Sequence, residues 1–189
     1  MERSNVAVNR FFGHLGTILA HRRAVYRHAK KVGIPWQGLT HDLSKFSPTE
    51  FFVGVKYYTG KRSPNEGERA AYGYSAAWLH HKGRNKHHFE YWTDYNPAER
   101  RVMPVKMPLK YCLEMFCDRV AASKTYLKDQ YTDAHPLEYF LGGTASRSMH
   151  PETSALLESW LVMLKEKGED ETLRYLRAYY KEHKKDDRI

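Results

Sequence analysis

The stretch Thr40-His41-Asp42-Leu43-Ser44-Lys45 places a histidine directly beside an aspartate, and the candidate ligands of the whole chain are ordered around this pair. A neutral imidazole and a carboxylate both bind divalent cations. The pair alone is weak evidence, because chance would supply about 0.5 His-Asp pairs in a chain of this composition. We expect a short helix to carry the pair, with Leu43 and Phe46 in the core holding it rigid.

Further candidate ligands lie on both sides of this pair. Residues 5–32 are predicted to form one long helix, on which His14, His21 and His28 share a face. Neighbouring histidines in this series are about 10 Å apart along the helix, so only one of them can bind a given metal ion. We take the central one, His21, as the ligand. We expect the other two to be core histidines with hydrogen-bonding partners.

Two histidine pairs follow the His-Asp pair, at positions 80–81 and 87–88. Apolar residues at steps of four and three place His81, rather than His80, on the buried face of a helix that ends at Gly83. His87 and His88 fall in the loop beyond it. Either member of each pair could face a metal ion.

An acidic residue, Asp118, lies within the apolar pattern of a helix predicted over residues 109–127. Leu113, Phe116 and Val120 form the buried face of that helix, and Asp118 lies at its edge. A carboxylate in such surroundings is costly without a partner, and a metal ion would supply one. The first predicted ligand set is therefore His21, His41, Asp42 and Asp118.

The order His, His-Asp, His, His, Asp resembles the HD superfamily of metal-dependent phosphohydrolases. The run beginning His41-Asp42-Leu43-Ser44-Lys45 also resembles a bacterial branch of HD-like proteins of similar length, and the resemblance covers roughly residues 10 to 125. It implies a helical bundle that binds a divalent metal, whether Mn, Fe, Ni, Co, Mg or Zn. It also implies hydrolysis of a phosphoester in a nucleotide or another small phosphorylated substrate.

The number of metal ions depends on the middle histidines. If His81 and His88 are also ligands, a second ion fits beside the first, and mixed His and carboxylate ligation suits Mn, Fe or Ni. Asn85 and His87 are then candidates for binding the substrate. Some HD-like proteins with six ligands resemble di-iron oxygenases instead, so an HD-type di-iron oxygenase is the first alternative function.

Three residues are predicted to serve catalysis. Lys45 and Arg84 could bind a phosphoryl group, the first as a point charge and the second through its planar guanidinium. Glu50 lies eight residues after Asp42, where some HD phosphohydrolases carry a carboxylate that positions the attacking water. Glu50 also has a structural explanation, because Ser47 and Glu50 form a capping box at the start of a helix.

The predicted fold is all-α, a single HD-like domain over residues 1–189 with about seven to nine helices. Its core spans about residues 5–128, and a helical extension covers about 129–185. No strand pattern is evident: residues 96–108 should be irregular, and residues 131–148 should be mostly loop.

The charge and the cysteines bear on partners and location. A formal net charge of +9 allows nucleic-acid binding, so a basic, non-enzymatic nucleic-acid binder is a second alternative, but charge alone does not define a site. The two cysteines lie in one predicted helix, which disfavours a disulfide framework and suits a reducing cytoplasm. No stretch has the length of apolar sequence that a membrane span needs.

Overall fold

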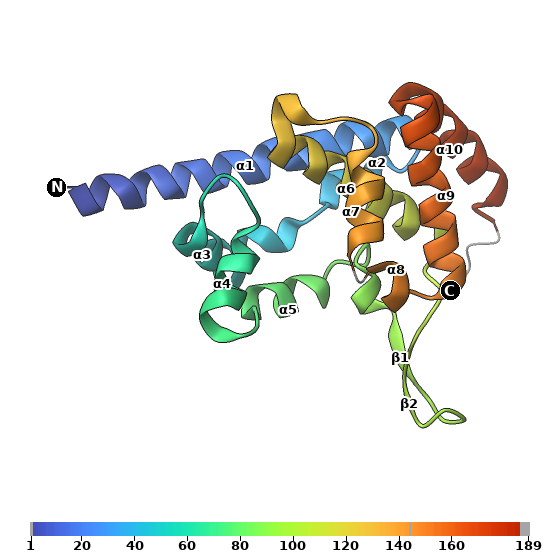
Figure 1. The fold of residues 1–189 in the computed structure, drawn as a ribbon, viewed down its shortest axis with the longest axis horizontal. Coiled ribbons are helices and arrows are strands. Elements are labelled where there is room, and N and C mark those ends of the chain that lie inside the picture. Colours follow the sequence, from blue (N-terminus) through green and yellow to red (C-terminus); the bar gives the residue numbers. More distant parts are fainter. Residues whose placement is uncertain (1, 144, 186–189) are drawn as a thin grey trace.

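The computed structural model of the protein describes residues 2–143 and 145–185, and nearly all of its regular structure is helical (Figure 1). The all-α fold is confirmed. The helices are α1 (Glu2–Val32), α2 (Pro35–Thr40), α3 (Pro48–Tyr57), α4 (Pro64–Tyr72), α5 (Ala76–Lys82), α6 (Leu109–Leu127), α7 (His135–Gly142), α8 (Ala145–Ser148), α9 (Pro151–Lys167) and α10 (Glu169–His183). Short 3₁₀ turns add η1 (Leu43–Phe46), η2 (Phe89–Tyr91) and η3 (Lys128–Gln130).

Two segments differ from the sequence prediction. An antiparallel hairpin of β1 (Thr93–Asn96) and β2 (Arg101–Pro104) projects from the helical body (Figure 1). Its second strand and its turn lie within residues 96–108, where irregular chain was expected. Residues 131–148 are not mostly loop, because they include α7 and α8. A proline in the first turn of α7 favours helix initiation, and Leu137 and Phe140 bury its inner face.

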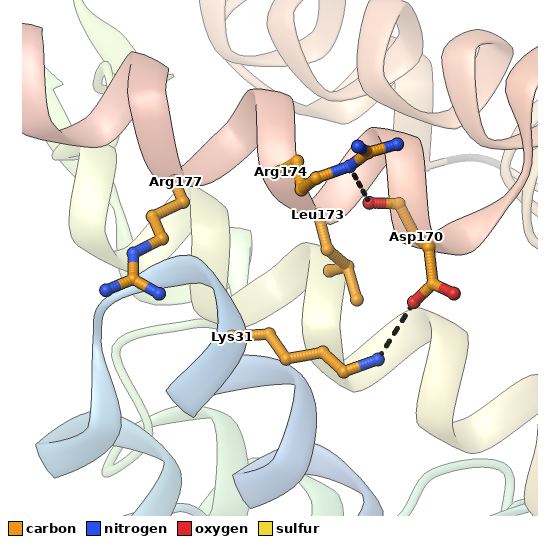
Figure 2. Close-up of a pocket in the computed structure, with 5 residues that line it drawn as sticks. All are labelled: Lys31, Asp170, Leu173, Arg174 and Arg177. Atoms are coloured by element: carbon orange, nitrogen blue, oxygen red, sulfur yellow. Dashed lines mark hydrogen bonds and ion pairs between the residues drawn. The ribbon is translucent and has the colours of Figure 1, made fainter.

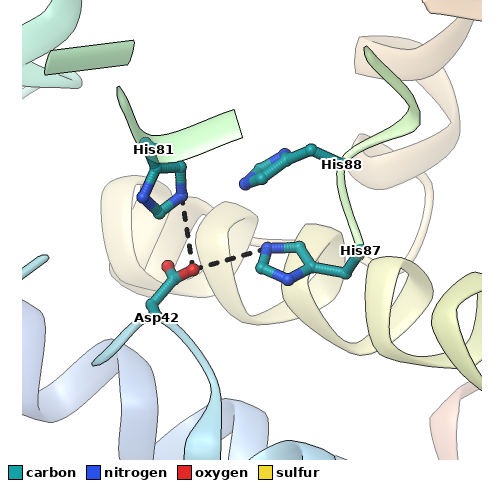
Figure 3. Close-up of side chains that lie close together, drawn as sticks. All are labelled: Asp42, His81, His87 and His88. Carbon is teal, nitrogen blue, oxygen red and sulfur yellow. Dashed lines mark ion pairs between the residues drawn. The ribbon is translucent and has the colours of Figure 1, made fainter. Parts of the chain in front are cut away.

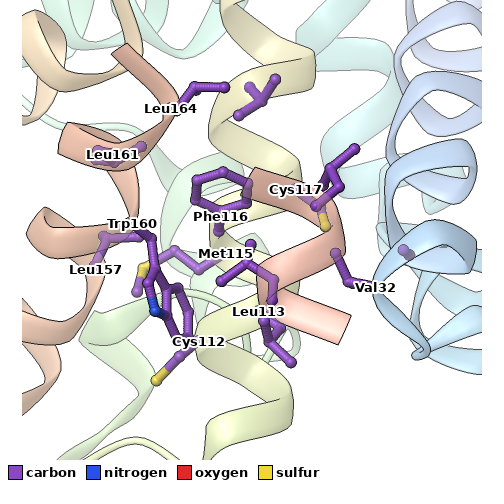
Figure 4. Packing of buried hydrophobic residues seen from close by; sticks show 14 of the residues in the cluster. Val32, Cys112, Leu113, Met115, Phe116, Cys117, Leu157, Trp160, Leu161 and Leu164 are labelled. Atoms are coloured by element: carbon purple, nitrogen blue, oxygen red, sulfur yellow. The ribbon is translucent and has the colours of Figure 1, made fainter. Parts of the chain in front are cut away.

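The core lies where α1, α6, α9 and α10 meet (Figure 4). Phe116 of α6 and Trp160 of α9 pack edge to face, with ring centroids 6.3 Å apart, and each is almost fully buried. Val32 of α1 and Leu176 of α10 belong to the same cluster. The helices beyond residue 128 therefore share one core with α1 and α6.

Helix α1 directs its three histidines to different surroundings. His14 lies against the ring of Phe51 in α3, and the Nε2 atom of His28 lies 3.3 Å from the Glu169 carboxylate at the start of α10. Only His21 faces the His-Asp pair. The structure thus separates these histidines as the helical spacing predicts.

Among the described residues, no helix combines the length and the apolar character that crossing a membrane requires.

We predict that Trp160→Ala lowers the free energy of unfolding by about 3–5 kcal/mol, because it leaves a cavity between α6 and α9. Tyr139→Ala is the matched control, since this aromatic side chain is 74% exposed and its removal should cost under about 0.5 kcal/mol. Urea denaturation followed by circular dichroism measures both. A small loss for Trp160→Ala would show that the carboxy-terminal helices are not part of the same core.

Candidate metal centre

The His-Asp pair lies in a sharp bend and not in a helix, contrary to the sequence prediction. Helix α2 ends at Thr40, His41 leaves helical geometry with φ of −50° and ψ of 127°, and Asp42 adopts the left-handed conformation with φ of 53°. Aspartate tolerates this conformation better than most residues. The bend turns the side chains of His41 and Asp42 inward, where each is 1% exposed. Leu43 and Phe46 were expected in the core, but both are exposed, Leu43 to 52% and Phe46 to 38%.

The first group of donors joins α1, the bend and α6. His21 Nε2 lies 3.0 Å from Asp118 Oδ1, and His41 Nε2 lies 3.4 Å from His21 Nε2. His41 Nε2 is also 3.3 Å from Asp42 Oδ2 and 3.5 Å from Asp118 Oδ1. One donor atom from each of these four residues falls within 4.8 Å of the others. The structure thus brings together the four residues of the first predicted ligand set.

A second group shares Asp42 and adds three histidines (Figure 3). Asp42 Oδ1 lies 3.3 Å from the Nε2 atom of His81, which comes from α5, and 3.5 Å from His87 Nε2. The ring of His88 lies 4.1 Å from that of His87 and 4.7 Å from that of His81, measured between centroids. His87, predicted to bind substrate, is therefore part of the donor cluster. His88 joins it as predicted.

Three buried polar atoms of this second group have no hydrogen-bond partner in the described part of the chain. They are Asp42 Oδ1, His87 Nε2 and His88 Nε2. An unsatisfied buried polar atom costs about 1–3 kcal/mol, so three in one place require an explanation. Because all three are metal-donor atoms of a single group, a divalent cation between them would satisfy them together. The residues present therefore fit a metal ion.

Glu114 is a site residue that the sequence analysis missed. One of its oxygens, Oε1, lies 3.0 Å from His41 Nδ1 and 3.1 Å from His87 Nδ1. Since both histidines turn Nε2 toward the other donors, Glu114 acts as a hydrogen-bond acceptor that fixes the two rings. Its position in α6, one turn before Asp118, could have identified it as a site residue from the sequence. Two acids four residues apart share a helix face, and Glu114 is buried among apolar residues.

Glu50 fixes the histidine rings of α5, as Glu114 fixes those of His41 and His87. Its carboxylate oxygens lie 2.6 Å from His80 Nδ1 and 2.7 Å from His81 Nδ1. Ser47 caps α3 as predicted, by accepting the Glu50 backbone N–H, but the Glu50 side chain turns to the histidines instead of completing the capping box. This carboxylate holds the His81 ring so that Nε2 faces Asp42.

The electrostatics of the cluster favour a cation. Burial tends to raise the pKa of Asp42, but His41 and Lys45 outweigh it and hold that pKa well below its usual range. The pKa of Asp118 is also well below its usual range despite burial, because His21 and His41 donate to it. Burial would lower the pKa of His41, yet Asp42 and Asp118 hold it well above 6.5. Both aspartates are therefore ionised, and they attract a dication.

The other predicted residues lie around the cluster. Lys45 Nζ is 2.7 Å from Asp42 Oδ2, with its side chain 32% exposed, so it links the cluster to solvent. Asn85 donates to Ser44 Oγ at 2.8 Å and lies 3.1 Å from His81 Nδ1, which ties the loop after α5 to η1. Arg84 is exposed and donates to the His80 carbonyl oxygen; no ion pair among the described residues joins it to the cluster.

A separate hollow of about 510 Å³ lies between α1 and α10 (Figure 2). Lys31 and Asp170 form an ion pair of 3.0 Å across it, and Arg174 and Arg177 complete its rim. None of the donor residues lines it. The candidate metal donors thus form a cluster distinct from this basic surface.

Comparison with protein families gives one match. Residues 10–163 match a family of unknown function, DUF5662. The chain belongs to the DUF5662 family. The matched segment contains every donor residue of the centre, from His21 to Asp118, and it ends within α9. No curated protein and no solved structure gives a significant match to the chain.

We predict that Glu114→Gln weakens metal binding about 10- to 100-fold, because glutamine cannot accept both ring N–H groups with the strength of a carboxylate. Glu138→Gln on the exposed face of α7 removes the same charge and should leave affinity unchanged. Titration with Co²⁺, followed by its visible absorption, measures both. Equal affinity in the two variants would show that Glu114 does not orient the donor histidines.

Proposed function

We propose that this DUF5662 protein is an HD-type metal-dependent phosphohydrolase that acts on a small phosphorylated substrate. One observation carries the proposal: two groups of His and Asp donors share the Asp42 carboxylate, one group at each of its oxygens. A carboxylate used in this way suits two divalent ions a few Å apart. Paired ions of this kind suit phosphoester hydrolysis, because they can stabilise both the attacking and the leaving oxygen.

The metal, when bound, supplies Lewis acidity and an activated water at neutral pH. The protein supplies the positioning. His21, His41 and Asp118 would hold one ion, His81, His87 and His88 would hold the other, and Asp42 would serve both. Glu114 fixes one ring of each set, His41 and His87, so it holds the two positions in a constant relation.

Lys45 is the candidate for phosphoryl binding. Its ammonium group contacts Asp42 and is partly open to solvent. No other lysine or arginine among the described residues pairs with a donor carboxylate. Burial alone would lower the pKa of Lys45, but Asp42 outweighs it and the pKa is raised, so the side chain stays charged. A phosphoryl oxygen that approached the centre from solvent would meet this charge.

A di-iron oxygenase is the second candidate, and a specific observation favours it. The second donor group contains three histidines and one carboxylate, a mixed ligand set that suits iron. The two candidates predict different metals and different reactions. Iron in the purified protein, with an absorbance change on exposure to oxygen, would favour the oxygenase.

The test combines metal analysis with turnover. We expect the wild-type protein, stripped and reloaded with Mn²⁺, to bind about two ions and to hydrolyse members of a panel of phosphomonoesters, nucleotides and cyclic nucleotides. Asp42→Asn should lose both ions, and His88→Ala should lose one, because it removes a donor of the second group alone. Lys45→Ala should keep both ions and lose turnover by about 10²-fold.

Lys61→Ala is the matched control, because it removes a lysine from an exposed loop and should change neither quantity. Two bound ions with no hydrolysis of any panel member, together with oxygen-dependent absorbance in the iron form, would replace the hydrolase with the oxygenase. An absence of metal binding would contradict both.

A further inference from the structure

An apolar stripe on the surface lies beside the metal centre. It consists of Trp36 and Leu39, one turn apart on α2, and of Leu43 and Phe46 of η1, which follows the bend at residues 41–42. All four are exposed; Trp36 is 70% exposed. Nothing in the described part of the chain covers it.

Helix α1 continues this apolar surface. Phe12, Leu19 and Tyr26 are seven residues apart, which places them on one face, and all three are exposed. Gly16 lies between the first two with nothing within 4 Å of the position that a Cβ would take. A mid-helix glycine costs about 0.5–1 kcal/mol relative to alanine, and no contact inside the chain requires this one. Another helix could approach α1 closely at this point.

The two surfaces meet in a hollow of about 210 Å³ between α1 and α2. We call this hollow and the four-residue apolar stripe the α1–α2 groove. The hollow is lined by Leu19, Arg22, Arg23, Tyr26, Gly38 and Leu39. Gly38 makes the groove possible, because a Cβ there would come within 2.6 Å of the Ala29 side chain and force the two helices apart.

The charges in the groove are unbalanced. Arg22 donates from Nη2 to the Leu39 carbonyl oxygen at 2.8 Å, and its guanidinium carbon lies 5.2 Å from the centre of the Phe46 ring. Its Nε atom is buried and has no hydrogen-bond partner among the described residues. Neither Arg22 nor Arg23 forms an ion pair within that part of the chain. Arg23, which is exposed, and Arg22, which is partly exposed, therefore present positive charge that the carboxylates of a partner would balance.

We propose that the α1–α2 groove binds an acidic amphipathic helix of a partner protein. The apolar anchors of that helix would lie on Leu19 and on the stripe residues Trp36, Leu39 and Leu43. Its carboxylates would pair with Arg22 and Arg23. This is the helix-in-groove mode of recognition, in which anchors at three- and four-residue spacing fill an apolar groove.

The same observations disfavour other occupants. A second copy of this chain, related by a two-fold axis through the groove, would bring arginines toward arginines. Single-stranded nucleic acid stacks successive bases on several aromatic rings, whereas the hollow itself is lined by two leucines and a single aromatic ring, that of Tyr26. A membrane surface would contact Trp36 but would not fill a concave hollow between two helices.

The test uses a series of synthetic peptides of about 18 residues, with Leu, Ile or Phe anchors at helical spacing and glutamates on both flanks. Each is compared with a twin in which lysines replace the glutamates. We expect members of the glutamate series to bind the full-length protein in fluorescence anisotropy at least about tenfold more tightly than their twins. Arg22→Glu with Arg23→Glu should reverse this order of affinity.

Arg174→Glu with Arg177→Glu is the matched control, because it makes the same charge change at the hollow between α1 and α10 and should leave peptide affinity unchanged. Trp36→Ala provides a variant that does not disturb the fold, since this side chain is largely exposed, and it should weaken binding about tenfold.

Three outcomes would overturn the proposal. The first is equal binding by the glutamate and lysine series. The second is peptide binding that neither groove variant changes. The third is failure of the peptides to bind while another partner binds instead: anionic vesicles, oligouridine or a second copy of the chain, the last detected by sedimentation. That binding would have to be weakened by Trp36→Ala. None of these readouts depends on hydrolysis, so the proposed function can fail separately.

Discussion

The structure depends on the burial of one carboxylate, that of Asp42. This side chain is 1% exposed and held on a left-handed backbone, so its charge has to be balanced by protein groups or by a bound cation. His41, His81, His87 and Lys45 all approach it, from three different parts of the chain. One oxygen still has no hydrogen-bond partner among the described residues. The same lack of a hydrogen-bond partner at His87 Nε2 and His88 Nε2 is the strongest physical argument for a metal.

The scaffold explains how such a costly cluster is maintained. Helices α1 and α6 pack against α9 and α10 through a continuous apolar core, and each delivers its donor from the face beside that core. Glu114 and Glu50 then fix the donor rings from behind. A ring fixed in this way does not lose rotational freedom when it binds a metal, and its Nε2 lone pair is already directed at the ion position.

The sequence was most informative where helical periodicity and chemistry agreed. His21 was selected from three equivalent histidines by its central position, and Asp118 by its place in an apolar helix; both lie at the centre. The role of His87 and the contribution of Glu114 were missed, because loop conformation and side-chain direction in α6 are set by tertiary packing. Leu43 and Phe46 were placed in the core by hydrophobicity alone. The bend at Asp42 leaves both side chains exposed instead. No local sequence pattern predicts an aspartate in the left-handed conformation.

Electron paramagnetic resonance of the Mn²⁺-loaded protein tests whether Asp42 is shared by two ions, as we propose. Two Mn²⁺ ions that share a carboxylate are exchange-coupled. We therefore predict, at two equivalents of metal, a broadened multiline spectrum with the closely spaced hyperfine lines of a coupled pair. Asp42→Asn should abolish this spectrum, whereas Glu138→Gln should retain it. A six-line spectrum of isolated Mn²⁺ that saturates at one equivalent would contradict a pair of ions sharing Asp42.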